Sequence, residues 1–121
     1  MTIFKLLNAL PILQRFTALS LPVKKAYKVY SLAKQINEQR EFFINEERKL
    51  VEKFEAEVLP DGRIQFKDSL QQAHFAQEYA ELKEYEVENF SPITLTFEDL
   101  GDAAITAADI SLLEGVIEFI E

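Results

Sequence analysis

Glu98, Asp99 and Asp102 form the best candidate set of oxygen ligands in the chain. Their spacing around Gly101 lacks the alternating acids of a calcium-binding loop. We therefore expect a solvated acidic turn that caps the last helix, and no metal site. His74 is the only histidine, and a single histidine within a helix is typically a surface or packing residue.

Other routes to catalysis are also missing from the sequence. Cysteine is absent, which removes thiolate ligands, cysteine nucleophiles and disulfides. The three glycines are too few and too far apart for a phosphate-binding loop or a dinucleotide fingerprint. A catalytic centre needs a nucleophile with a base, paired carboxylates in a pocket, or a metal. The sequence thus predicts a protein that is not an enzyme, with no catalytic residue, metal or cofactor.

The charged residues are divided along the chain. Residues 1–40 carry seven Lys or Arg and one acid, whereas residues 41–121 carry six basic residues and twenty acids. The two parts have net charges of +6 and −14, which add up to −8 for the whole chain. They can attract each other within a monomer, between subunits, or toward outside partners of either sign.

The basic part contains a segment with Lys24, Lys25, Tyr27, Lys28 and Tyr30 that could contact phosphates and stack on bases. The tyrosines fall at core-like helical spacing, however, and the acidic remainder would repel nucleic acid. A nucleic-acid partner is therefore not expected. The opposite alternative is that the acidic part mimics DNA and occupies a basic groove of a host protein.

Length and composition favour one domain over residues 1–121. The first 21 residues are rich in Leu, Ile and Phe but are interrupted by polar residues, so we expect neither a membrane span nor a secretory signal. We interpret them as a helix over residues 3–19, broken or kinked at Pro11. Ser20 is then expected to cap the next helix, with Pro22 in its first turn.

The next helix is predicted to run from residue 22 to about residue 55, because no Gly or Pro interrupts its three- and four-residue steps. Such a helix is longer than a domain of this size needs, so part of it should project or be covered by another subunit. A turn at residues 59–63 predicts a small β-hairpin. Asp68 and Ser69 then cap a helix over residues 70–84, which should pack antiparallel to the long helix.

A two-residue period over residues 85–97 predicts two short strands or one bent strand, in a short antiparallel sheet. Thr106 and Asp109 have the spacing of a capping box and open a last helix to residue 121. The predicted fold class is α+β and mostly helical: a long helix and an antiparallel second helix joined by a β-hairpin, a short antiparallel sheet and a C-terminal helix.

This last helix would be apolar around most of its circumference, with one polar stripe, so something must cover it. We therefore expect a homo-oligomer or an obligate protein complex. The candidate contact residues are three lysines of the basic segment and four apolar residues of the last helix: Lys24, Lys25, Lys28, Leu112, Val116, Phe119 and Ile120. The same lysines are expected to pair with acids of that helix, namely Glu114, Glu118 and Glu121.

The order of these elements resembles a known family. Leu21-Pro22-Val23-Lys24-Lys25-Ala26-Tyr27 opens the long helix, Phe75-Ala76-Gln77-Glu78-Tyr79-Ala80-Glu81-Leu82 lies in the second, and the chain closes on Phe119-Ile120-Glu121. The pattern is similar to small uncharacterised proteins encoded by tailed bacteriophages and prophages of low-GC Gram-positive bacteria. It covers most of residues 8–121, although the hairpin region is shorter than in that family and the N-terminus is truncated.

The resemblance implies a phage protein and brings no catalytic residues. Together with the composition it predicts a non-catalytic virion or assembly component that acts through protein–protein contacts. Such a protein would be found in the virion or the host cytoplasm. The alternatives are a phage-encoded regulator or inhibitor that binds a host protein and, third, a nucleic-acid-binding accessory protein.

Overall fold

The computed structural model describes residues 1–121, and its first element is helix α1, Ile3–Phe16. Thr2 caps this helix by accepting a hydrogen bond from the Lys5 N–H. Pro11 lies within α1 on its exposed side, and the helix continues through it, so the expected break at Pro11 is absent. The opposite side is fixed by seven buried residues: Ile3, Leu6, Ala9, Leu10, Ile12, Leu13 and Phe16.

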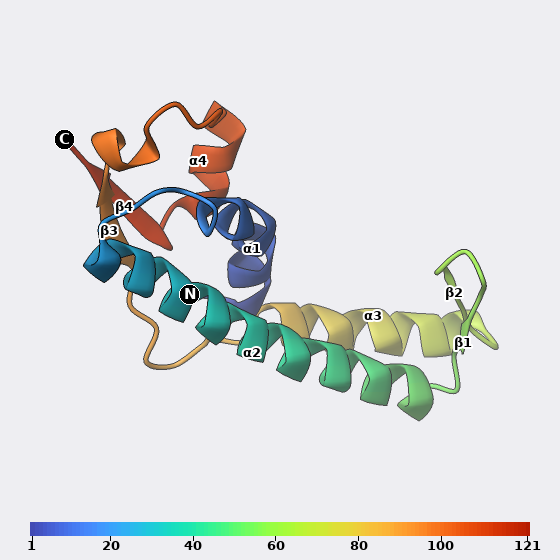
Figure 1. Ribbon diagram of the computed structural model, residues 1–121. Coiled ribbons are helices and arrows are strands. Elements are labelled where there is room, and N and C mark those ends of the chain that lie inside the picture. Colours follow the sequence, from blue (N-terminus) through green and yellow to red (C-terminus); the bar gives the residue numbers. More distant parts are fainter.

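Helix α2, Val23–Lys53, confirms the predicted long helix. At about 1.5 Å per residue it is roughly 46 Å long. Its N-cap residue is Pro22, which offers no side-chain hydrogen bond, so the prediction that Ser20 caps it is wrong. Only its first two thirds contribute buried residues, from Val29 to Phe43. The remainder extends away from the rest of the molecule, as Figure 1 shows.

That extension forms an arm with helix α3, Ser69–Lys83. Strands β1, Glu57–Val58, and β2, Ile64–Gln65, make the predicted antiparallel hairpin at its tip. Asp68 caps α3 by accepting from the Gln71 N–H, as expected. Figure 1 shows α3 returning beside the second half of α2, which confirms the antiparallel pair.

The arm has its own small aromatic cluster. The ring centroid of Phe75 lies 5.1 Å from that of Phe66, 5.6 Å from Tyr79 and 6.3 Å from Phe54. The Tyr79 hydroxyl donates to Glu47 across the helix pair at 2.8 Å. Partial burial and this hydrogen bond raise the pKa of Tyr79 to about 12. Aromatic packing and polar bonds therefore hold the arm together outside the main core.

The C-terminal third differs most from expectation. Strand β3, Ile93–Thr96, leads through a 3₁₀ helix η1, Phe97–Leu100, and a short helix α4, Ala107–Leu113, into strand β4, Ile117–Ile120. β3 and β4 pair in parallel, with Ile93 opposite Ile117 and Leu95 opposite Phe119. The prediction of a helix to residue 121 is therefore wrong, and this sheet is parallel rather than antiparallel.

Gly115 explains the early end of α4. It has a φ of +81°, in the left-handed region that glycine reaches without steric cost, and it follows the C-cap residue Glu114. The chain turns there and re-enters as a strand. Parallel strands need a crossover connection, which η1 and α4 supply here.

Tyr85 and Val87 do not pair with β3 either. The Ile3 N–H donates to the Tyr85 carbonyl at 2.8 Å, and the Val87 N–H donates to the Met1 carbonyl at 3.0 Å. The stretch after α3 is thus bonded to the first residues of the chain. It leads the chain from the arm back to the part of the molecule that contains the main core, which we call the body.

The core of the body is shared by five elements. It comprises 17 buried apolar residues, with Leu95, Leu113 and Val116 fully buried between α1, α2 and the sheet. No polar or charged residue is buried. The structure is α+β and mostly helical, as predicted.

Candidate protein-contact site

The four apolar contact residues predicted for the last helix have different environments. Val116 is fully buried, so its side chain belongs to the core and cannot itself meet a partner. Phe119 is half-buried, stacked on Phe97 at 5.9 Å and edge-on to Phe16 at 6.4 Å. Leu112 and Ile120 are 42% and 45% exposed. Their side chains remain available at the surface, but on a short helix and a strand rather than on one helix face.

A groove lies between α4 and β4, next to these residues. One face of α4 lines it at positions 107, 110, 111 and 114, which follow helical steps of three, one and three. Ile117, Glu118 and Phe119 of β4 also line it, together with Gly115 and Pro92. Its volume is about 580 Å³, within the range of small-ligand pockets. We call it the α4–β4 groove.

The groove combines apolar surface with negative charge. Ile110, Ile117 and Phe119 supply apolar atoms, whereas Glu114 and Glu118 are exposed carboxylates on its wall. Neither glutamate forms an ion pair within the chain. The predicted pairing of Glu114, Glu118 and Glu121 with Lys24, Lys25 and Lys28 is therefore absent from the monomer. The groove is suited to a segment that is apolar and positively charged.

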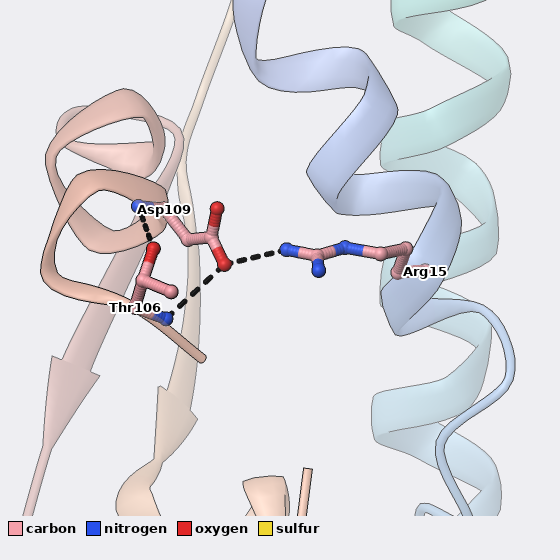
Figure 2. A network of polar contacts seen from close by, with 3 residues as sticks. All are labelled: Arg15, Thr106 and Asp109. Atoms are coloured by element: carbon pink, nitrogen blue, oxygen red, sulfur yellow. Dashed lines mark hydrogen bonds and ion pairs between the residues drawn. The ribbon is translucent and has the colours of Figure 1, made fainter. Parts of the chain in front are cut away.

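The basic and acidic parts of the chain do meet, but at two other acids. Arg15 of α1 donates to Asp109 at 2.6 Å, and the same carboxylate oxygen accepts from the Thr106 N–H at 3.1 Å (Figure 2). The Asp109 N–H donates back to the Thr106 hydroxyl, which completes the predicted capping box. The Arg15 hydrogen bond, followed by that of the Thr106 backbone, lowers the pKa of Asp109.

Asp99 has the same arrangement in η1. It forms a capping box with Thr96, and its carboxylate accepts from Lys25 of α2 at 2.7 Å. The Lys25 hydrogen bond is the largest cause of its lowered pKa. Asp99 is therefore a structural anchor, and the prediction that it lies in a solvated turn is wrong. No three His, Cys, Asp or Glu residues gather in an arrangement that could hold a metal ion.

The three candidate lysines are thus separated by role. Lys25 is anchored to Asp99, whereas Lys24 and Lys28 are exposed and form no ion pair.

Beside Lys24 and Lys28 on α2, the side chains of Val23, Tyr27 and Tyr30 are 85%, 67% and 59% exposed. The tyrosines are therefore not core residues, although their spacing suggested it. We call these five residues, Val23, Lys24, Tyr27, Lys28 and Tyr30, the Tyr27 face.

His74 lies on the arm, exposed and edge-on to Phe54 at 6.3 Å between ring centroids. This agrees with its expected surface or packing role. Its helix, α3, lies in a different part of the molecule from α4, as Figure 1 shows.

Sequence reasoning missed the groove because it treated residues 106–121 as one helix. The signal that could have revealed it is Gly115, since a glycine followed by Val, Ile and Phe fits a helix end and a strand. The Thr96–Asp99 capping box was also missed, although its spacing matches that of Thr106 and Asp109.

No protein-family model, curated protein or solved structure matches the chain. The resemblance to phage-encoded proteins therefore stays a prediction from the residues quoted for it. None of the helices combines the length and apolar character needed to cross a lipid bilayer.

Proposed function

We propose that this protein is non-catalytic and acts through protein–protein contacts, as a component of a phage virion or of its assembly. The observation that carries the proposal is the α4–β4 groove. Its apolar lining residues and two unpaired carboxylates form a recessed surface that suits a side-chain cluster of a protein partner.

The position of the groove supports this function. It is built on α4, which Arg15 anchors to α1, and on β4, which pairs with β3 along its whole length. A recognition surface held on paired and anchored elements loses little conformational entropy on binding. The phage setting is proposed from the family resemblance alone, and a location in the virion or the host cytoplasm is proposed with it.

The Tyr27 face favours a second candidate function. Exposed lysines next to exposed tyrosines are the residues with which proteins hold single-stranded nucleic acid. The net charge of −8 opposes it. A regulator that binds a host protein would use the same groove, and differs from the main proposal in where its partner is found.

The test compares the wild-type chain with two variants in the phage or prophage that encodes it. Ile110→Gln removes an apolar group from the groove at a site that is 42% exposed, so folding should be retained. Val58→Gln, in the hairpin, is the matched control at a site that is 59% exposed. Quantitative mass spectrometry of purified particles and of infected-cell complexes measures where each protein is found.

We expect the wild-type and Val58→Gln proteins in particles or assembly complexes, and Ile110→Gln at a level reduced at least several-fold. Recovery of all three only with a host protein would support the regulator instead. Equal recovery of Ile110→Gln and wild type in the same complexes would show that the groove is not the contact surface.

A further inference from the structure

The chain carries two exposed surfaces with complementary chemistry. The Tyr27 face is aromatic and basic, and the α4–β4 groove is apolar and acidic. We infer that the groove of one copy receives the Tyr27 face of a second copy, so that the protein associates head to tail. This inference rests on the proposed function of the groove as a protein-contact site and names its partner.

The Tyr27 face lies on the side of α2 that points away from the core. Val29, Leu32 and Ile36 are buried, and residues 23, 27 and 30, at steps of four and three, fall outside this buried stripe. The rings of Tyr27 and Tyr30 are 6.2 Å apart and form a continuous exposed surface. Aromatic residues gathered in this way are typical of the centres of protein interfaces.

The charges of the two surfaces match. Lys24 and Lys28 lie beside the tyrosines, and Glu114 and Glu118 lie on the groove wall. All four are exposed and none forms an ion pair in the monomer. By contrast, Arg15 and Lys25 of the basic part are already bonded to Asp109 and Asp99. The charged side chains without a partner in the monomer are therefore positive on the Tyr27 face and negative in the α4–β4 groove.

The same charges disfavour a two-fold symmetric contact through either surface alone. Groove against groove would bring Glu114 and Glu118 together with their copies, and face against face would do the same with Lys24 and Lys28. A contact between unlike surfaces avoids both repulsions. A head-to-tail pair still has one free groove, on one copy, and one free face, on the other, so the assembly either closes into a ring or grows as a chain.

The test uses the purified chain of residues 1–121 in sedimentation velocity at near-physiological salt. The Debye length of roughly 8 Å there screens repulsion between distant charges more than attraction between charges in contact. One variant reverses the face (Lys24→Glu with Lys28→Glu). A second reverses the groove (Glu114→Lys with Glu118→Lys). A control reverses Arg40 and Arg48 to Glu, both exposed and unpaired on α2, with the same charge change as the face variant.

We expect the wild type and the control to associate with rising concentration, and each of the other two variants to require at least tenfold more protein. An equimolar mixture of the face and groove variants should associate again, because each supplies the surface that complements the other. Far-UV circular dichroism verifies folding. If the face variant is unfolded, Tyr27→Gln replaces it, and if the groove variant is unfolded, Ile110→Gln replaces it; each should weaken association to a similar extent.

A wild-type protein that stays monomeric over the micromolar range would overturn the inference. So would a mixture that fails to associate, or a control that weakens association as much as the face variant. If the monomeric wild type binds single-stranded oligonucleotides and the face variant does not, the Tyr27 face is a nucleic-acid surface instead. The two proposals can fail separately. If the wild type does not self-associate but Ile110→Gln still lowers incorporation into particles, the head-to-tail contact is refuted and the proposed function is retained.

Discussion

Replacing Gly115 with alanine distinguishes the observed fold from the helix that the sequence suggests. Within a helix, alanine in place of glycine should stabilise the protein by about 1 kcal/mol. In the structure Gly115 has a φ of +81°, so an L-residue there is strained by roughly 1–2 kcal/mol. The two interpretations therefore predict effects of opposite sign.

The surroundings of Gly115 add to the cost. A Cβ atom at this position would lie 2.7 Å from the Met1 Cε atom, so the end of the Met1 side chain must move. Moving one packed methyl group away from its contacts costs about 0.8 kcal/mol. The lower entropy of the unfolded alanine chain offsets about 0.4–1 kcal/mol. We expect Gly115→Ala to lower the free energy of unfolding by about 1–2 kcal/mol.

Gly62→Ala is the matched control. Gly62 has a φ of +87°, but nothing lies within 4 Å of an added Cβ, so backbone strain acts there alone. The strain less the entropic offset should leave about 0–1.6 kcal/mol of destabilisation. The difference between the two variants measures the Met1 contact.

Urea unfolding followed by far-UV circular dichroism measures both effects. With a slope of about 2 kcal/mol/M, Gly115→Ala should lower the urea midpoint by about 0.5–1 M, and Gly62→Ala by less. A midpoint that rises for Gly115→Ala would refute the turn at Gly115. Residues 106–121 would then have to be a continuous helix, and the α4–β4 groove would not exist.

Two further outcomes follow from the capping boxes. Thr106→Ala should lower the free energy of unfolding by about 1 kcal/mol in the same urea assay, because the side-chain cap of α4 is lost. His74→Ala, at an exposed site, is the control and should change the free energy of unfolding by less than about 0.5 kcal/mol. Equal effects of the two substitutions would contradict the role given to Thr106. Because Asp99 and Asp109 have lowered pKa values in the folded state, the stability that they contribute is complete above the unfolded pKa of about 4 and is lost as the pH falls through their lower folded values. Asp99→Asn with Asp109→Asn should destabilise the protein at neutral pH and reduce the loss of urea midpoint below about pH 4, and an unchanged acid profile would contradict this assignment.

The arm was predictable because its signals are local. An uninterrupted helical period, a proline and glycine turn and an aspartate cap each fix one element within a few residues. Two helices that are joined by a tight hairpin are expected to pack antiparallel.

The exposed tyrosines of α2 could not be predicted in the same way. Their spacing is compatible with burial, and only the position of the rest of the chain decides which side of α2 is covered.

The C-terminal residues were ambiguous for a physical reason. Ile117 and Phe119 lie on either side of Glu118, as a period of two requires, yet Glu114, Glu118 and Glu121 also fall on one helical stripe. Local pattern cannot choose between these periods. Two features outside the pattern settle the choice: the turn at Gly115, and the pairing of β4 with a strand some twenty residues earlier, in which Ile93 lies opposite Ile117. The helix interpretation gave weight to the stripe and treated the glycine as an ordinary polar position.

The division of charge along the sequence has a different meaning in the folded chain. Of the three kinds of attraction that the division allows, the one within a monomer is present, in the pairs of Arg15 with Asp109 and of Lys25 with Asp99. Each of these carboxylates also accepts a hydrogen bond from the backbone N–H of a capping threonine. The capping bond therefore fixes the orientation of the carboxylate independently of the cation. An acid fixed in this way loses less conformational entropy on pairing than a free glutamate on a strand or a turn. This explains why the internal pairs form at Asp99 and Asp109, and why Glu114 and Glu118 are left for a partner.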